Sequence, residues 1–185
     1  MKFLPRPLKY LFTVFKRIPI AFLLFLFLTG CELYGRIGGD DANIPGALPE
    51  LLQGEWIYFQ PGSSVPSERY VIGENTIRYG YGGGEWETNY KGNICFVSNY
   101  SADSGVIIIE YTEPPYYAGY NGNSFFGVYY RNLKSNTVQL ANAINPDHST
   151  APDMATLEEA VQKFTRLQMG NYVDWGVVQP QTRVR

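Results

Sequence analysis

The sequence predicts a mainly β protein, either an antiparallel barrel of about eight strands or a sandwich, with one helix near its C-terminal end. Short segments rich in Tyr, Ile, Val and Phe alternate with clusters of Gly, Asn, Pro and Ser. Short strands with regular turn spacing are typical of sandwiches and up-and-down barrels. Without its first 30 residues the chain keeps 155 of 185, enough for one domain with a full core.

The first 30 residues differ from the rest and predict a signal peptide. Lys16 and Arg17 precede an uncharged apolar run of 12 residues, 18–29. A transmembrane helix needs about 20 residues, whereas the core of a signal peptide has about 7–15 and follows positive charge. An uncleaved N-terminal anchor is the alternative. A single span over residues 8–28 would bury cations at about 2.5–3.5 kcal/mol each, which favours the signal peptide.

The apolar run ends in Leu28-Thr29-Gly30-Cys31, which resembles the lipobox of bacterial lipoproteins. In that family a peptidase cuts before a cysteine that already carries diacylglycerol. The resemblance therefore implies a mature chain that begins at a lipidated Cys31 and is held at a membrane by acyl chains such as palmitate. In lipoproteins, Asp after the cysteine tends to retain the protein at the inner membrane. Glu32 by analogy predicts the outer membrane, on its periplasmic or surface face.

Removal of the signal peptide would leave an acidic domain. It takes away five of the 15 Lys and Arg residues and none of the 17 Asp and Glu residues, so the mature chain has a net charge of about −7. An acidic domain repels nucleic acids and anionic lipid head groups. We therefore expect no nucleic-acid partner, and a membrane attachment that depends on acyl chains.

A tether and then the strands follow the signal peptide. Residues 31–49 are rich in Gly, Asp, Ala and Pro and show no apolar period, which predicts a flexible tether before a barrel domain at 50–176. Lys91-Gly92-Asn93 is expected to form a turn, and the segment around Val106 to Ile109 is apolar on both faces. The expected strands are residues 56–60, 68–72, 76–79, 85–90, 94–98, 106–111, 125–131 and 137–141.

One helix is predicted at about residues 156–169. Thr156 and Glu159 have the spacing of a capping box, and apolar residues recur at helical spacing through Leu167. Gly170 is placed to end the helix. Residues 172–176 are expected to be a short extended piece packed on the barrel, and residues 177–185 a loose tail.

Gly54-Glu55-Trp56 resembles the Gly-x-Trp motif of lipocalins and related calycin barrels. In that family the Trp closes one end of an eight-stranded barrel, and a late Arg stacks on it, for which Arg131 is a candidate. The resemblance covers residues 51–175 in architecture but only Gly54 and Trp56 in motif. Another small barrel or a sandwich remains the alternative. Eight strands leave room for side chains or one small ligand, so we expect a small apolar ligand or a packed core.

The loop expected at residues 112–123, with the residues just after it, is the candidate recognition surface. Tyr116, Tyr117, Tyr120 and Phe125 are interleaved with Gly and Asn. This composition is typical of recognition loops, and tyrosine faces also stack on sugars. It predicts capture of a glycan or an envelope protein. The alternative is a hairpin tip whose rings close over the mouth of the barrel.

Catalysis finds little support in the sequence. His148 is the single histidine and lies next to Asp147 and Ser149, but adjacent loop residues point apart, whereas a triad is assembled from distant segments. Glu85 and Glu87 share a strand face and would form a carboxylate pair or, more simply, an exposed strand surface. We therefore expect a binding protein and not an enzyme. A structural or surface-interaction lipoprotein with a packed core is the alternative.

Cys95 lies in an apolar strand and is expected to be a small core thiol. A disulfide with Cys31 is the alternative if Cys31 is not lipidated. With one histidine and no second thiol nearby, we expect no metal site and no cofactor.

Overall fold

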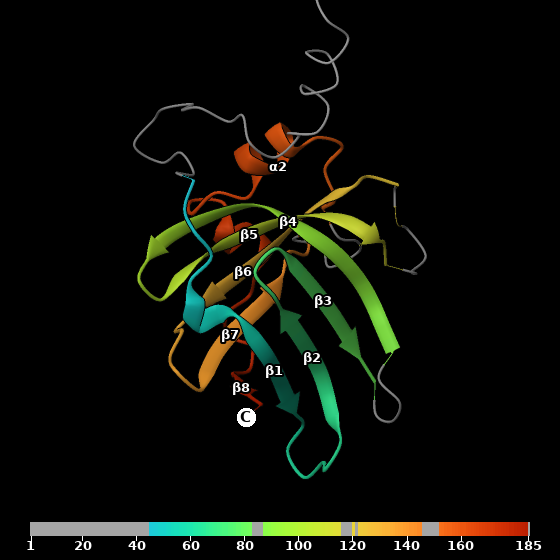
Figure 1. Cartoon of the computed structure of the whole chain (residues 1–185), viewed down its shortest axis with the longest axis vertical. Helices are drawn as coiled ribbons and strands as arrows, with labels where there is room; N and C mark the ends of the chain where they lie inside the picture. The colour runs from blue at the N-terminus through green and yellow to red at the C-terminus, as the bar shows by residue number, and fades with distance from the viewer. Residues whose placement is uncertain (1–44, 83–86, 116–119, 121, 146–151, 185) are drawn as a thin grey trace, which may run out of the picture. The chain divides into compact units, whose positions relative to one another are not determined.

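A computed structural model describes residues 45–82, 87–115, 120, 122–145 and 152–184. Their eight antiparallel strands form a closed barrel in sequence order (Figure 1), which confirms the predicted fold class. The strands are β1 (Gly54–Phe59), β2 (Pro66–Ile72), β3 (Thr76–Tyr81), β4 (Glu87–Ser101), β5 (Ser104–Glu113), β6 (Phe125–Arg131), β7 (Thr137–Asn142) and β8 (Gln181–Arg183). The helices are the 3-10 turn η2 (Glu50–Leu52), α2 (Leu157–Lys163) and α3 (Met169–Tyr172).

β4 is one long strand where the sequence predicted two. It runs through Lys91-Gly92-Asn93, which we expected to be a turn. A Cβ atom on Gly92 would come within 2.8 Å of the Glu110 carbonyl oxygen in β5. The β4–β5 register shifts at Lys91/Gly92 and again between Ile94 and Phe96. Gly92 therefore permits a bulge and a close approach of two backbones instead of a turn.

Cys95 lies at the second of these register shifts. It is half-buried, so the expectation of a core thiol is wrong. Cys95 lies between Ile94 and Phe96, where the pairing with β5 is interrupted. The alternation of inward and outward side chains along β4 is therefore broken at this residue.

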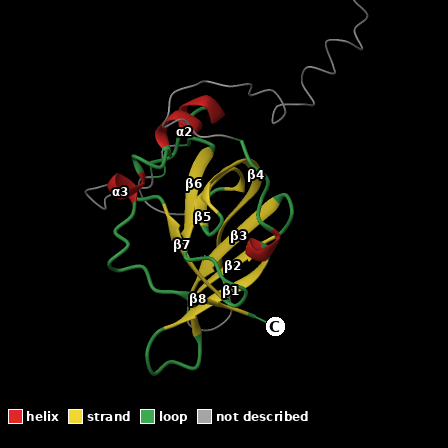
Figure 2. Ribbon diagram, turned by 90° about the vertical axis from the view of Figure 1, so that its left-hand side faces the viewer, coloured by secondary structure: helices red, strands yellow, loops and turns green. Residues whose placement is uncertain are grey.

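The last strand comes from the segment that we expected to be a loose tail. β8 pairs with Trp56 and Ile57 of β1 and with Thr137 and Val138 of β7. Figure 2 shows β8 beside β1. Its three residues are too few to show alternation in the sequence. Only the pairing with distant strands defines it.

α2 begins at the predicted capping box but ends early. The Thr156 hydroxyl accepts a hydrogen bond from the Glu159 N–H, and the Glu159 carboxylate accepts one from the Thr156 N–H. The helix ends at Lys163, because Phe164 leaves the helical conformation and its ring is fully buried. Gly170 lies inside α3 instead of ending α2. Residue 172 ends α3, so the extended piece expected at 172–176 does not begin there.

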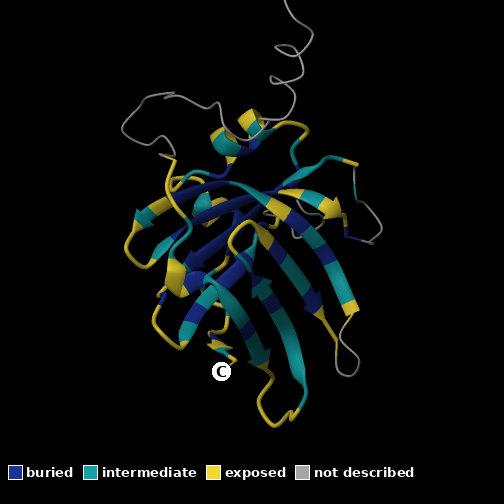
Figure 3. Ribbon diagram, in the orientation of Figure 1, coloured by how far each residue is buried: buried dark blue, intermediate teal, exposed yellow. Residues whose placement is uncertain are grey.

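β6 and residues 105–109 of β5 are buried, as the dark blue of these strands in Figure 3 shows. The inner face carries Phe126, whose ring lies 5.7 Å from that of Tyr90 across the interior. The outer face is covered by α2: a Cβ atom on Gly127 would come within 2.8 Å of the Phe164 ring. Ile108 pairs with Gly127 and so shares the outer face. Because α2 covers the outer face of these strands, residues 106–109 are apolar on both faces.

Trp56 is fully buried at one end of the barrel interior. Its indole Nε1 donates a hydrogen bond to the Leu52 carbonyl, 2.8 Å away, in η2. The residue over its ring is Arg183 of β8, with 5.4 Å between the guanidinium carbon and the ring centroid. The candidate from the sequence, Arg131, lies instead over Trp175 at 4.2 Å. Residue 131 follows the inward Tyr130 and therefore points out of the barrel.

Most of the predicted N-terminal segments lie outside the described residues, including Leu28-Thr29-Gly30-Cys31 and residues 31–44 of the expected tether. The described end of that tether contacts the barrel. The Gly46 N–H donates to the Val97 carbonyl at 2.8 Å, and the Asn99 amide donates to the Ala47 carbonyl at 3.0 Å. Among the described residues, no helix has the length and apolar character that a membrane span requires.

Candidate functional site

The short β8 leaves part of the gap between β1 and β7 without a strand. β1 and β7 each have six residues, whereas β8 has three. The chain before β8 crosses this gap, where the Gln139 amide donates to the Val178 carbonyl at 2.6 Å. A cavity of about 280 Å³ remains there, which we call the seam cavity. It is lined by Tyr58, Glu68, Tyr70, Tyr79, Leu140, Ala141, Asn142, Ile144, Tyr172, Val173, Asp174, Val177, Val178 and Gln179.

The lining of the seam cavity is aromatic and acidic. Tyrosines come from β1, β2, β3 and α3, and apolar side chains come from β7 and from the segment after α3. Glu68 and Asp174 are its charged residues among those described, and both are acidic. Asp174 is exposed and its Oδ1 accepts the Gly176 N–H at 2.9 Å, so it lies at the solvent side. The charged side chains of the described lining are therefore all negative.

Glu68 points into the barrel because it alternates with Tyr70 and Ile72, which are both buried on the inner face. Its Oε2 accepts a long hydrogen bond, 3.3 Å, from the Gln181 amide nitrogen. Burial raises the pKa of the Glu68 carboxyl above its ordinary value, and the Gln181 hydrogen bond lowers it by less. The carboxylate is thus desolvated with weak compensation.

Gln181 is held in place by β7 and also faces Glu68. It is almost completely buried. Its Oε1 accepts the Leu140 N–H at 2.8 Å, and its Nε2 also lies 3.3 Å from the Leu140 carbonyl oxygen. The same amide nitrogen therefore serves both the Leu140 carbonyl and the Glu68 carboxylate.

A row of aromatic rings extends from the seam cavity through the barrel interior. The rings of Tyr70 and Tyr79 are 4.6 Å apart, and those of Tyr79 and Tyr90 are 5.3 Å apart. The Tyr90 hydroxyl donates to Asn142 Oδ1 at 2.7 Å. Burial raises the pKa of the Tyr70 and Tyr90 hydroxyls well above their ordinary value, and the nearby Glu68 carboxylate raises both further. These phenols are neutral at physiological pH and present ring faces to the interior.

The predicted recognition loop is described only in part. Tyr116 and Tyr117 lie outside the described residues, as does Cys31. Tyr120 is half-buried: its hydroxyl donates to the Asn123 carbonyl at 2.7 Å, and its ring lies 6.0 Å from that of Tyr111. Neither Tyr120 nor Phe125 lines the seam cavity.

The contacts of the loop residues tie them to the segment before α2. The Phe125 and Met154 backbones exchange two hydrogen bonds, of 3.0 and 2.8 Å. The Asn123 amide donates to the Asp153 carbonyl at 3.0 Å, and the Tyr111 hydroxyl donates to Asp153 Oδ1 at 2.9 Å. These described contacts stabilise the base of the loop.

The residues that we considered for catalysis do not gather in the described part of the chain. Glu87 is exposed at the start of β4. Glu85 and His148 lie outside the described residues. Within the described ranges, no three His, Cys, Asp or Glu side chains come together in a group that could hold a metal ion.

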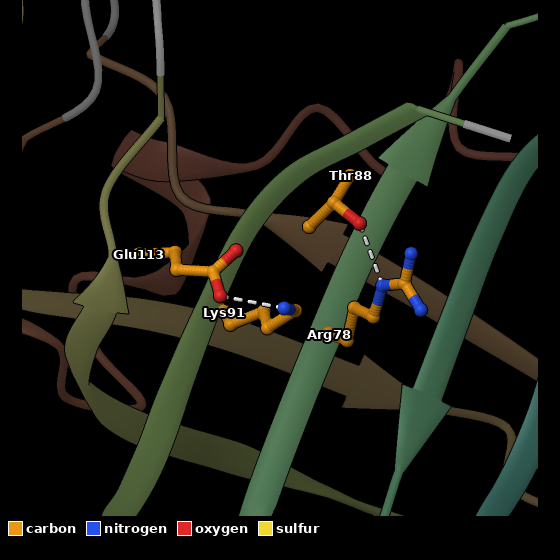
Figure 4. A network of polar contacts seen from close by, with 4 residues as sticks. All are labelled: Arg78, Thr88, Lys91 and Glu113. Carbon is orange, nitrogen blue, oxygen red and sulfur yellow. Dashed lines mark hydrogen bonds and ion pairs between the residues drawn. The ribbon is translucent and has the colours of Figure 1, made fainter.

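The outer face of β3 to β5 carries a second polar cluster, shown in Figure 4. Arg78 and Lys91 are directly opposite each other in the β3–β4 pair. Lys91 Nζ lies 2.6 Å from the Glu113 carboxylate, and Arg78 Nε donates to the Thr88 hydroxyl at 2.6 Å. An exposed ion pair of this kind contributes about 0.2–1 kcal/mol. We interpret the cluster as surface that stabilises the sheet.

Glu68 was not among the predicted site residues, although the sequence contains a signal for it. In the strand predicted at residues 68–72, Tyr70, Ile72 and Glu68 fall on one face at a period of two residues. A charged residue at an inward position is expensive to bury without a partner. That conflict marks the position as a candidate site.

No family model, curated protein or solved structure matches this chain.

Proposed function

We propose that this protein is a lipid-anchored binding protein of the bacterial cell envelope, whose barrel takes one small ligand into the seam cavity without chemically changing it. The observation that carries the proposal is the cavity of about 280 Å³ beside Glu68. Small-molecule sites typically enclose about 300–1,000 Å³. The seam cavity therefore suits a ligand at the small end of that range.

The size of the ligand is limited by large side chains in the barrel interior. Trp56 and Phe126 are buried and do not line the seam cavity. Their rings occupy interior volume that a long apolar ligand would need, which favours a small ligand in the seam cavity.

The chemistry of the lining favours binding over turnover. Tyrosine rings and carboxylates fix the position of a ligand. The Glu68 carboxyl would exchange protons with a bound molecule, but among the described residues the lining has no Ser, Cys or Lys nucleophile for it to activate. We therefore propose a carrier or sensor and not a hydrolase.

The lipobox resemblance of Leu28-Thr29-Gly30-Cys31 supports the proposed location in the envelope. A chain processed as a lipoprotein should incorporate labelled palmitate in a bacterial host and lose its first 30 residues. Cys31→Ser should then carry no palmitate and, because the peptidase cuts only before a lipidated cysteine, should keep its signal peptide and run as a larger chain. A parent chain of full length without palmitate would favour an uncleaved anchor. A Glu32→Gln variant is the control and should be labelled and cleaved as the parent is.

A cavity-filling variant tests the binding site. Val178→Trp places a large ring in the seam cavity, whereas Val184→Trp changes a partly exposed valine outside it. The chain carrying Cys31→Ser is screened for small molecules that raise its melting temperature. We expect ligands that stabilise the parent and the Val184→Trp control but not Val178→Trp. If no small molecule acts on the parent chain, the structural lipoprotein with a packed core is the better interpretation.

A further inference from the structure

We propose that the seam cavity selects a small organic cation, a substituted ammonium whose nitrogen lies beside the Glu68 carboxylate and whose carbon atoms contact tyrosine rings. This inference rests on the proposed function and names the class of ligand. Three observations carry it: the sign of the charge, the poor compensation of Glu68 and the placement of the rings.

The charge of the lining selects against anions. Glu68 and Asp174 both line the seam cavity, and no Lys, Arg or His side chain is among the described lining residues. A cavity with walls of low polarity and charges of one sign concentrates counter-ions and repels ions of like charge. The ligand that fits this field is positively charged.

Glu68 receives one long hydrogen bond from the described residues, although a carboxylate can accept several. It comes from the Gln181 amide nitrogen, 3.3 Å away, which also faces the Leu140 carbonyl. A carboxylate removed from water with so little compensation is costly. A neutral apolar ligand would displace the remaining water and raise that cost. An ammonium group would offset it through an ion pair in a partly desolvated site.

The rings beside Glu68 fit the carbon part of such a ligand. Tyr70 and Tyr79 are inclined at 40° with their centroids 4.6 Å apart, and Tyr58 lies opposite Glu68 in the β1–β2 pair. Neutral tyrosine faces carry negative potential and attract cations within about 6 Å of the ring centroid. One carboxylate with several tyrosines thus recognises the charge and the substituents together.

A bare metal ion fits this site less well than an organic cation. Metal ions are held by several oxygen, nitrogen or thiolate ligands that converge on one point. The described residues contain no such group of three His, Cys, Asp or Glu side chains. Rings and aliphatic side chains make up most of the lining and would contact carbon atoms instead.

The test compares cations with neutral molecules of the same shape. Choline is paired with 3,3-dimethylbutan-1-ol, and benzylammonium with benzyl alcohol, in calorimetric titrations of the Cys31→Ser chain at pH 7. We expect at least one cation to bind about tenfold or more tightly than its neutral counterpart. Raising the salt concentration should weaken the binding of the cation and leave the affinity for the neutral molecule unchanged.

Variants then assign the selectivity to Glu68. Glu68→Gln keeps the shape of the side chain and should lower the affinity for the cation about tenfold or more, while circular dichroism shows a folded chain. Glu74→Gln, at an exposed turn, is the matched control and should bind as the parent does. Replacing Tyr79 with Leu should lower the affinity for the cation more than the affinity for its neutral counterpart. The substitution removes an aromatic ring but keeps an apolar side chain.

The outcomes separate this inference from the proposed function. Equal binding of each cation and its neutral counterpart, lost in Val178→Trp, would overturn cation selectivity and leave a binding barrel. Preference for a cation that persists in Glu68→Gln would also overturn the assignment to Glu68. If other small molecules stabilise the parent chain but none of these four binds it, cation selectivity fails alone. If no molecule of any charge binds, both proposals fail.

Discussion

Arg183 lies over the ring of Trp56 and is also its direct partner in the pairing of β8 with β1. The guanidinium Nη2 of Arg183 donates in addition to the Gln53 carbonyl, in the connection between η2 and β1. One side chain thus joins the closing strand, the first strand and the turn that precedes it. Barrel closure depends on this contact.

Replacing Arg183 with Ala should destabilise the barrel strongly. The substitution removes a cation–π contact of about 0.5–2 kcal/mol and a charged hydrogen bond of about 1.5–3 kcal/mol. We expect the free energy of unfolding in urea to fall by about 2–4 kcal/mol. Arg166→Ala, at an exposed position after α2, should change it by less than about 0.5 kcal/mol. Equal effects of the two substitutions would contradict the closing role of Arg183.

Gly127→Ala should loosen the contact between α2 and the barrel. The new methyl carbon would lie 2.8 Å from the Phe164 ring, and overpacking of this kind costs about 1–3 kcal/mol. In a Phe164→Leu background the smaller side chain should relieve most of this cost. A double-mutant cycle by urea unfolding measures the coupling, and additive effects would show that α2 does not pack over Gly127.

Tyr129→Phe and Tyr130→Phe should have opposite effects, although the residues are neighbours. The Tyr129 hydroxyl is buried without a hydrogen-bond partner among the described residues, whereas the Tyr130 hydroxyl donates to Asn99 Oδ1. Removing an unsatisfied buried hydroxyl should be neutral or stabilising by up to about 1 kcal/mol, and removing a paired one should cost about 1–2 kcal/mol. Urea unfolding compares them, and a loss of stability in Tyr129→Phe would indicate a partner for that hydroxyl.

Glu68→Gln should make the protein more stable at pH 7 and should change how its stability depends on pH. Because burial raises the pKa of Glu68 in the folded state, the folded chain holds a proton that the unfolded chain has already released. The free energy of unfolding therefore falls as the pH rises from about 4.3, the unfolded pKa, through the folded pKa, and this loss persists above it.

The measurement for Glu68 is urea unfolding of the parent chain and Glu68→Gln at pH 4 and pH 7. The advantage of the variant should be present at pH 7 and should shrink towards pH 4, where the parent carboxyl is protonated. Glu74→Gln should show no such difference between the two pH values. A lower stability of Glu68→Gln at pH 7 would mean that the carboxylate is well compensated, and the argument for a cationic ligand would weaken.

The sequence predicted the strands whose alternation or turn chemistry is local. β6 has the predicted bounds, β2 ends at the predicted residue 72 and β3 begins at the predicted residue 76. The capping box predicted the start of α2 because its two hydrogen bonds lie within four residues. Its end was missed because Phe164 leaves the helix to pack over Gly127, a contact that no local pattern encodes.

The missed features depend on partners that are distant in sequence. Gln181 and Arg183 form a strand only because β1 and β7 flank them. Gly92 resembles a turn residue, but its close neighbour is Glu110 on the next strand. The strand period places Glu68 inward, but the cavity beside it depends on the short β8 and on the segment before it, which the sequence pattern does not predict.

The pairing of β1 with β8 also constrains when the molecule can fold. The Gln53 carbonyl and the Arg183 guanidinium are 130 residues apart in sequence, so no part of the chain between them closes the barrel alone. Contacts of such high sequence separation slow folding, since the entropy of a long loop is lost before the contact forms. A chain that emerges vectorially keeps an open sheet edge at β1 until β8 has appeared. Such a delay keeps the chain unfolded for longer, which suits the export across a membrane that we propose for this protein.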